Sequence, residues 1–246
     1  LRTYKKNTKQ FNLYLEMYKN QTIDFVKSKR EEYGKLNKTR MTIHEALKML
    51  DSFVDPSDPD LDVPNSIHAY QTAERIRKKY PNDKEFQIIG LIHDLGKVLF
   101  SFGEESWAVV GDTFALGCEI PKSIVYYENA TKYNKPCIYK NGCGLDNLII
   151  SYGHDEYLYS VLKSNKNHKI SKKYMDIIRY HSFYPWHTEG EYKHLTNRND
   201  EDTLKKVLDF NNFDLYSKED DVLIDSHVKS YYNDILNEYF FGELCW

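Results

Sequence analysis

The sequence predicts an all-α protein, organised as one HD-domain-like helical bundle over residues 1–246. Glycine (11) and proline (7) together make up about 7% of the chain, where ordinary proteins have about 12%. Hydrophobic residues make up 41%, which is enough for a sizeable core at this length. Apolar residues also recur at helical spacing along most of the chain. So few turn-forming residues disfavour a many-stranded sandwich or barrel.

The first helices are expected where apolar and polar residues alternate with a period near 3.6. This pattern covers 12–32 and 41–53, after which Pro56 and Pro59 exclude a continuous helix. Asn65 or Ser66 can cap the next helix, which is expected to end near Pro81. A helix over 84–102 follows, and its apolar residues occur on all sides, as is typical of a buried helix.

The second half of the chain begins with an expected long surface loop over 117–144, because that stretch contains two prolines and several glycines. Helical spacing returns after the loop. The expected helices are 145–162, 171–182, 201–212 and 226–239.

Charge and cysteine content exclude several classes of protein. The formal net charge of −3 argues against a general nucleic-acid binder, which usually has a basic excess. No run of 18 uncharged apolar residues is present, so a membrane span is not expected. The chain opens without the apolar core of a signal peptide, and its four cysteines form no CxxC or zinc-finger spacing. We therefore expect a cytoplasmic protein with free thiols and without nucleic acid or membrane partners. We also expect it to act as a monomer.

Polar residues interrupt the apolar helix over 84–102, in the sequence IIGLIHDLGKVLF. Burying His93, Asp94 and Lys97 without partners would cost several kcal/mol, about 2–7 for a neutral polar group and more for a charge. Neighbouring His and Asp side chains can bind one metal ion, and the second carboxylate oxygen can then bridge to another ion. The cluster therefore suggests a metal site.

Other helices carry similar polar residues on apolar faces. His154 and His181 fall in apolar rows, His68 lies in the first turn of its helix, and Asp214 lies where a helix is expected to end. A single such histidine is more often a hydrogen-bonded core residue than a ligand. Several on separate helices favour a metal site, and imidazole with carboxylate suits iron, manganese or zinc. The remaining histidines are expected to be ordinary surface residues: His44, His168, His187, His194 and His227.

The order His68, His93-Asp94 and a later Asp is similar to the H…HD…D pattern of HD-domain metalloproteins. Longer motifs are more specific, and together they resemble the myo-inositol oxygenase family over essentially the whole chain, from Arg2 to Trp246. The departures concentrate before Asn20 and in 126–141. The motifs are DPSDPDLDVPNSIHAYQTAE, GLIHDLGK, WAVVGDTFALGC, SYGHDEYLY, RYHSFYPWH and FNNFDLYSK.

The resemblance implies a non-haem di-iron enzyme that opens the ring of myo-inositol with O2 to give D-glucuronate. Its two irons would be mixed-valent, Fe(II)/Fe(III), with O2 as co-substrate. One iron would be held by His68, His93 and Asp214, and the other by His154 and His181. Asp94 would bridge the two. Asp155, in a second His-Asp pair, is interpreted as an outer residue that orients a ligand histidine.

The resemblance also implies which residues contact substrate. Lys97, one turn from His93, can in addition donate to a metal-bound alkoxide and favour its deprotonated form. For the acidic loop at 55–57 a solvated turn is an equally good reading, and for Lys218 a surface lysine is the simpler one. The implied substrate contacts are Arg2, Asp55, Pro56, Ser57, Lys97, Gly111, Asp112, His181, Ser182 and Lys218.

Two other functions share parts of this pattern. An HD-type metal-dependent phosphohydrolase has the same H…HD…D order, and its metal ions would activate water against phosphorus. Such sites gather Lys and Arg for phosphate, whereas the helices here supply mainly Lys97. A non-catalytic scaffold with a structural metal is the other alternative. The oxygenase is favoured because His154 and His181 lie within the longer motifs.

Overall fold

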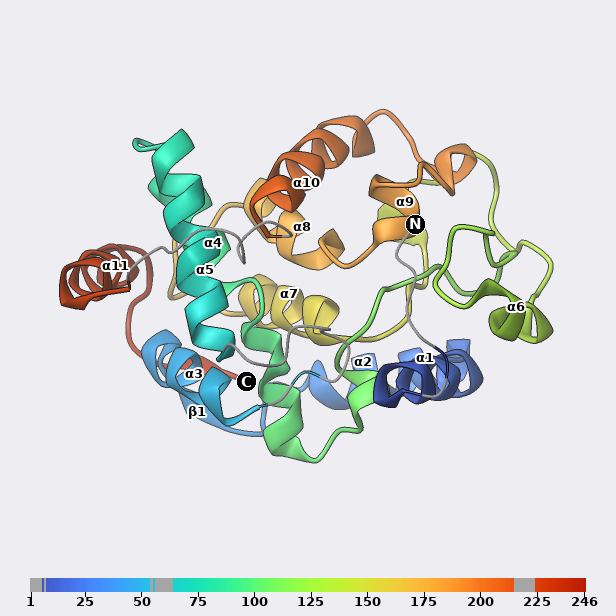
Figure 1. The fold of residues 1–246 in the computed structure, drawn as a ribbon, viewed down its shortest axis with the longest axis horizontal. Coiled ribbons are helices and arrows are strands. Elements are labelled where there is room, and N and C mark those ends of the chain that lie inside the picture. Colours follow the sequence, from blue (N-terminus) through green and yellow to red (C-terminus); the bar gives the residue numbers. More distant parts are fainter. Residues whose placement is uncertain (1–5, 7, 54, 56–63, 215–223) are drawn as a thin grey trace.

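The structure, a computed structural model, describes residues 6, 8–53, 55, 64–214 and 224–246. These residues form α-helices and short 3-10 helices joined by irregular loops (Figure 1), which confirms the all-α prediction. The one sheet in this part of the chain is an antiparallel pair of two-residue strands, β1 (Arg40–Met41) and β2 (Leu244–Cys245). No helix among the described residues combines the length and apolar character needed to cross a membrane.

The α-helices follow the predicted order along the chain. They are α1 (Lys9–Asn20), α2 (Ile23–Tyr33), α3 (Ile43–Met49), α4 (Asn65–Lys79), α5 (Lys84–Ile92), α6 (Tyr127–Ala130), α7 (His154–Ser164), α8 (Lys172–Tyr180), α9 (Tyr184–His187), α10 (Asp200–Asp214) and α11 (Ser226–Tyr239). The 3-10 helices are η1 (Leu50–Ser52), η2 (Leu95–Phe102), η3 (Ser106–Ala108), η4 (Thr131–Tyr133), η5 (Leu145–Asn147) and η6 (Lys193–Leu195).

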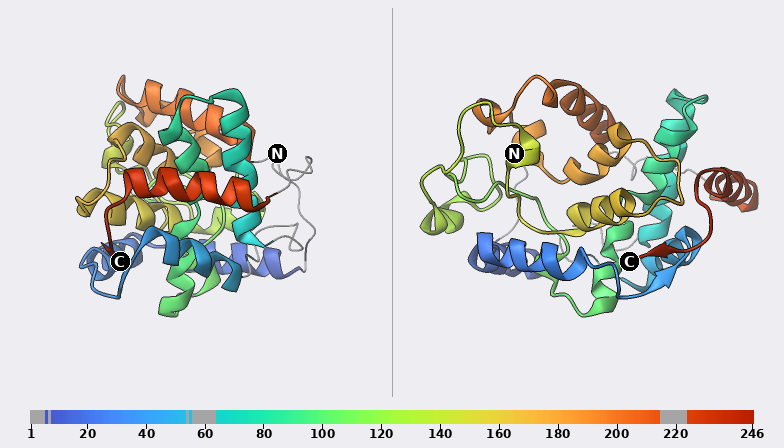
Figure 2. Two further views of the ribbon diagram at one scale, coloured as in Figure 1. Left: turned by 90° about the vertical axis from the view of Figure 1, so that its left-hand side faces the viewer. Right: turned by 180° about the vertical axis from the view of Figure 1, so that it is seen from behind.

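The inner helices contact one another directly. Helix α5 packs on α4 and α8, α8 also packs on α7 and α10, and η2 packs on α7. Helices α1 and α2 lie along one edge of the molecule, with α10 at the opposite edge (Figures 1 and 2). Helix α11 lies outside α4 and α5, which it covers on one side (Figure 2). Elements far apart in the sequence therefore meet at the middle of the bundle.

The predicted helix over 12–32 is two helices, because the chain leaves the helical conformation at Gln21 and Thr22. Thr22 caps α2 by accepting a hydrogen bond from the Phe25 amide. The Gln21 side chain is buried, donates to the carbonyl of Tyr152 at 2.7 Å, and accepts from the Tyr152 amide at 2.9 Å. Gln21 thus ties the α1–α2 corner to the segment just before α7.

The prediction of one helix over 84–102 is wrong at its centre. Helix α5 ends at Ile92, and after His93 and Asp94 the chain continues as the 3-10 helix η2. Residues 86–99 of this stretch are all buried, as predicted, whereas its two ends are not. Because the break falls at His93 and Asp94, these two residues lie at a junction between helices and not inside a regular helix.

The predictions for the start of two other helices also need correction. Helix α4 begins without a side-chain cap, and the Asn65 side chain instead donates from Nδ2 to the carbonyl of Phe53 at 2.7 Å. Helix α7 begins at His154, not at residue 145. His154 therefore lies in the first turn of α7, where the helix leaves the preceding irregular segment.

The segment over 117–144 is irregular, as predicted, but much of it is not at the surface. Its turns contain α6 and η4, and it contributes apolar side chains to the core. The buried ones are Cys118, Ile120, Ile124, Val125 and Ala130. The prediction of a long surface loop missed them because turn-forming residues mark irregular backbone and not exposure.

Gly96 brings η2 into direct contact with the first turn of α7. A Cβ atom at Gly96 would lie 1.8 Å from the backbone carbonyl oxygen of His154. We therefore expect Gly96→Ala to displace the His154 backbone and to lower the free energy of unfolding by about 1–3 kcal/mol or more. Chemical denaturation measures this. As a control, Gly103→Asn adds a side chain where nothing lies within 4 Å, at a φ of +87° that asparagine adopts more readily than most residues. It should therefore cost less than Gly96→Ala, and equal losses in both variants would contradict the expectation.

Candidate metal centre

Six residues predicted as metal ligands converge at the middle of the bundle, each at or near the end of a helix. The structure describes all of them, although they come from five separated segments of the chain. They are His68 in α4, His93 and Asp94 after α5, His154 at the start of α7, His181 after α8, and Asp214 at the end of α10.

Potential ligand atoms form two groups, and Asp94 belongs to both. The first contains His68, His93 and Asp94, and the second contains Asp94, His154 and His181. Within each group, one nitrogen or oxygen from every side chain lies within 4.8 Å of the others. Two adjacent sites that share a carboxylate are the arrangement required for a bridged pair of metal ions.

The first group also includes Asp214, whose carboxylate lies between two imidazoles. Its Oδ1 lies 2.9 Å from His68 Nε2 and 3.3 Å from His93 Nε2. His93 Nε2 in turn lies 3.5 Å from Asp94 Oδ2. The Nε2 atoms of His68 and His93 and one oxygen each of Asp94 and Asp214 are therefore close enough to bind one ion together.

The second group uses the other oxygen of Asp94. Asp94 Oδ1 lies 3.2 Å from His154 Nε2 and 4.0 Å from His181 Nε2. The two imidazole nitrogens are 3.1 Å apart. Because Oδ2 faces the first group and Oδ1 the second, the Asp94 carboxylate is oriented to bridge two ions.

Backbone carbonyls fix the orientation of three of these imidazole rings. In His93, His154 and His181, Nδ1 donates to a carbonyl oxygen, so that the neutral ring keeps a lone pair on Nε2. The lone pairs of His154 and His181 therefore face each other at 3.1 Å, an arrangement that a cation bound by both would stabilise. The three acceptors are Gly90, Val109 and Ile178, at 2.9, 2.7 and 2.7 Å.

The electrostatic environment also suits a cation. Burial disfavours ionisation of Asp94, but Lys97 and the neighbouring histidines hold the pKa of its carboxyl well below the usual value. Burial, together with the adjacent His154 and His93, lowers the pKa of His181 to about 3. The carboxylate is therefore ionised and this imidazole neutral at physiological pH, which are the forms that bind metal. Oxygen and imidazole ligands without thiolate fit iron, manganese or zinc.

Comparison with known proteins identifies the family. The family model for myo-inositol oxygenase matches residues 7–246. This chain belongs to the myo-inositol oxygenase family. The mouse inositol oxygenase is 45% identical over 96% of this chain and 86% of its own length. The human inositol oxygenase is 44% identical over the same shares of the two chains. Inositol oxygenase 1 of Arabidopsis thaliana is 48% identical over 92% of this chain and 76% of its own.

Lys97 lies beside the centre in this member of the family, with its ammonium group between two carboxylates. Its Nζ lies 2.9 Å from Asp94 Oδ2 and 2.8 Å from Asp55 Oδ2. All three side chains are buried. Burial lowers the pKa of Lys97, but the carboxylates of Asp55 and Asp94 outweigh this effect and raise it above the usual value. Lys97 therefore stays charged next to the predicted bridging ligand.

A backbone hydrogen bond links two segments that carry predicted substrate contacts. The Thr113 amide donates to the Ser182 carbonyl at 2.9 Å, which places Asp112 near the residue that follows His181. Asp112 is buried and accepts a hydrogen bond from the Tyr14 hydroxyl at 3.0 Å. Gly111 adopts φ of +108°, which favours glycine. The other predicted contacts lie outside the described residues: Arg2, Pro56, Ser57 and Lys218.

Asp155 does not orient a ligand histidine as predicted. The Nδ1 atom of His154 donates to the Val109 carbonyl, and Asp155 Oδ1 accepts from the Glu156 amide. Glu156 itself has a role that the sequence analysis missed. It accepts a hydrogen bond at 2.8 Å from Arg179, and this buried ion pair links α7 to α8 two residues away from His154 and His181.

His187 was expected at the surface, but it is buried beside His181. Its Nε2 donates to the His181 carbonyl at 2.9 Å, and its Nδ1 lies 2.9 Å from the Thr188 hydroxyl. The sequence offered one signal, namely that His187 follows three aromatic residues and a proline in HSFYPWH.

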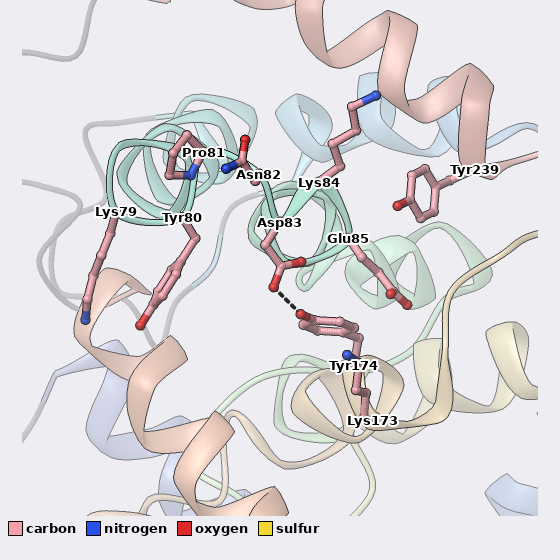
Figure 3. Close-up of a pocket in the computed structure, with 10 residues that line it drawn as sticks. All are labelled: Lys79, Tyr80, Pro81, Asn82, Asp83, Lys84, Glu85, Lys173, Tyr174 and Tyr239. Carbon is pink, nitrogen blue, oxygen red and sulfur yellow. Dashed lines mark hydrogen bonds between the residues drawn. The ribbon is translucent and has the colours of Figure 1, made fainter.

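A surface hollow of about 480 Å³ lies where α4 ends and where α5 and α8 begin, at the opposite ends of these helices from the predicted ligands (Figure 3). Tyr80 follows the last residue of α4, and Tyr174 lies in the first turn of α8. The Tyr174 hydroxyl donates a hydrogen bond to Asp83 (Figure 3). Two of its lysines are paired with acidic residues, Lys79 with Asp209 and Lys84 with Glu238. None of the six predicted metal ligands lines this hollow, so it is separate from the metal centre.

Metal binding is expected to release protons at neutral pH. Burial lowers the pKa of His93, but the carboxylates of Asp94 and Asp214 outweigh it and raise the value to about 8. Below pH 8 a metal ion must therefore displace the proton from this imidazole. We expect metal binding to release at least about one proton per chain at pH 7. The metal affinity should then rise about tenfold per pH unit for each released proton, up to about pH 8. Calorimetry with Mn²⁺ in buffers of different ionisation enthalpy measures this release, and a value near zero at pH 7 would contradict it.

Proposed function

We propose that this chain is an inositol oxygenase, which cleaves the ring of myo-inositol with O2 to give D-glucuronate. The family membership and the names of the mouse, human and plant relatives support this proposal. The single structural observation that carries it is the pair of ligand groups that share Asp94. The whole of residues 1–246 would form one catalytic domain.

The metal centre would consist of two iron ions, cycling as a mixed-valent Fe(II)/Fe(III) pair with O2 as co-substrate. His68, His93 and Asp214 would hold one ion, His154 and His181 the other, and Asp94 both. Bound there, the ions would supply the redox chemistry and the Lewis acidity that the protein side chains lack. The carbonyl hydrogen bonds to Nδ1 of three histidines hold their Nε2 atoms toward the ions.

The substrate is an uncharged polyol, so it must be held by directional hydrogen bonds. We assign these to Asp112, Ser182 and the Gly111 backbone, with Arg2, Pro56, Ser57 and Lys218 as further contacts from the resemblance. The Thr113–Ser182 bond keeps two of these contacts in a fixed relation. Pre-positioned polar groups of this kind orient one ring carbon for reaction.

Lys97 would stabilise the deprotonated form of the substrate hydroxyl that reacts. Its ammonium group can donate to the substrate hydroxyl oxygen and favour the deprotonated form. Asp55, at 2.8 Å from Nζ, keeps Lys97 charged and fixes its direction. A charged donor fixed before substrate arrives avoids reorganisation during the reaction.

The protein is further proposed to act as a cytoplasmic monomer. The four cysteines are free thiols, as is usual in reducing compartments. The large hydrophobic side chains exposed among the described residues are Ile138, Leu208 and Phe241. They lie in three separate parts of the chain, namely the loop after η4, helix α10 and the turn between α11 and β2. Such isolated residues are normal on monomer surfaces and form no extended apolar patch.

Oxygen uptake and phosphate release distinguish this proposal from a phosphohydrolase. We expect iron-loaded protein to consume O2 only when myo-inositol is present, and to release no phosphate from nucleotides or phosphodiesters. Among the described residues, Lys97 is the lysine or arginine that pairs with a predicted metal ligand. Phosphate-binding sites usually gather several such side chains. Phosphate release without inositol-dependent O2 uptake would overturn the proposal. If the metal-loaded protein shows neither activity, the metal is structural.

A further inference from the structure

We propose that His187 is a positioning residue that holds the second metal site together through the backbone of His181. This inference rests on the proposed metal centre and assigns a role to a histidine outside the ligand set. The side chain of His187 is 4% exposed. It belongs to neither ligand group, so its burial calls for another explanation.

The end of α8 explains why a donor is needed there. The last carbonyl groups of a helix have no partner within the helix. His181 follows the last residue of α8, and its carbonyl accepts the Nε2 proton of His187 at 2.9 Å. The next carbonyl, of Ser182, accepts from the Thr113 amide at 2.9 Å. Both carbonyls at the helix end are thus held by groups from outside it.

The hydrogen bonds of His187 define its tautomer. Because a carbonyl only accepts, Nε2 must carry the proton, and Nδ1 is left to accept from the Thr188 hydroxyl at 2.9 Å. This is the reverse of His181, which donates from Nδ1 to the Ile178 carbonyl at 2.7 Å. The His187 ring is therefore oriented toward the backbone, whereas the His181 ring is oriented toward Asp94.

Together these bonds fix His181 at its ring and at its carbonyl. His181 Nε2 lies 3.1 Å from His154 Nε2, so small movements of its backbone change the geometry of the second site directly. Residues that orient metal ligands typically contribute 10–100-fold to metal affinity. The ligands specific to the first site, His68, His93 and Asp214, lie in α4, after α5 and in α10, outside this turn. Loss of the His187 hydrogen bond should therefore weaken one site selectively.

Two amide variants separate the hydrogen bond from the bulk of the side chain. In His187→Gln, the longer amide can place a donor where Nε2 stands, whereas in His187→Asn the shorter amide cannot reach the carbonyl. We expect anaerobic Fe²⁺ titration to give two binding steps in the natural protein and in His187→Gln. In His187→Asn, the weaker step should lose about 10–100-fold in affinity while the other is unchanged. Mössbauer spectra should show the same selective loss.

His168 provides a matched control at a helix end away from the centre. Its Nε2 lies 2.6 Å from the Leu162 carbonyl in the last turn of α7. His168→Asn should lower stability without changing either iron-binding step. Equal iron affinities in the Asn and Gln variants at position 187 would overturn the inference, as would parallel weakening of both steps. If the natural protein binds two irons but does not oxidise inositol, the proposed function fails while this test still holds.

Discussion

Asp94→Ala is expected to abolish binding of both metal ions and, with them, all turnover. Asp94 contributes a different oxygen to each ligand group, at 3.5 Å from His93 Nε2 and 3.2 Å from His154 Nε2. Removing it leaves each group with fewer ligands and removes the negative charge between the two ions. Metal analysis and glucuronate assays of folded protein measure the loss.

The matched control for this variant is Asp202→Ala in α10, where the Asp202 side chain is 81% exposed. It changes the net charge equally but lies in solvent, so iron content and turnover should be unchanged. Circular dichroism checks that both variants keep their helices. An Asp94→Ala protein with two irons and full turnover would refute the bridging assignment.

Lys97→Ala is expected to keep both metal ions but to lose turnover by about 10²–10³-fold, the usual effect of removing one preorganised donor. The variant leaves Asp55 and Asp94 without the ammonium group that lies 2.8 and 2.9 Å from them. Bound metal ions compensate the charge of Asp94, so iron content should be retained. The measurement is iron per chain together with kcat.

Lys173→Ala is the control for Lys97, because Lys173 is an exposed lysine at the start of α8, near the surface hollow (Figure 3). It should leave kcat unchanged. If Lys97→Ala loses iron while it stays folded, Lys97 is a structural partner of Asp94 and the substrate role is wrong.

The position of the candidate metal centre could be predicted because burial of polar groups leaves a clear mark in a sequence. His93 and Asp94 stand in a run of isoleucine and leucine, and His154 and His181 stand in apolar rows. A cost of several kcal/mol for unpaired burial makes such residues informative. The structure brings all of them together with Asp214.

Helix ends were predicted less well because they depend on tertiary contacts. The apolar run through His93 continues without a break, but the helix ends at Ile92. The approach of η2 to the His154 carbonyl requires Gly96, and its partner is 58 residues away. Local periodicity contains no information about a contact at that separation.

His187 was mispredicted for a similar reason. Its neighbours in the sequence are an aromatic residue and a polar threonine, and no apolar row at helical spacing marks it as buried. Its partner is a backbone carbonyl at the end of α8, and every residue has such a group. A side chain that satisfies a helix end can be recognised only once that end is located.

The most direct test of the central claim is to follow glucuronate formation while iron is added to the metal-free protein in known ratios. If the centre is a bridged pair, activity should be low up to one iron per chain. It should then rise to its maximum near two, with O2 consumed in proportion to the myo-inositol cleaved. Full activity at one iron per chain, or activity that does not depend on iron, would contradict a bridged pair built on Asp94.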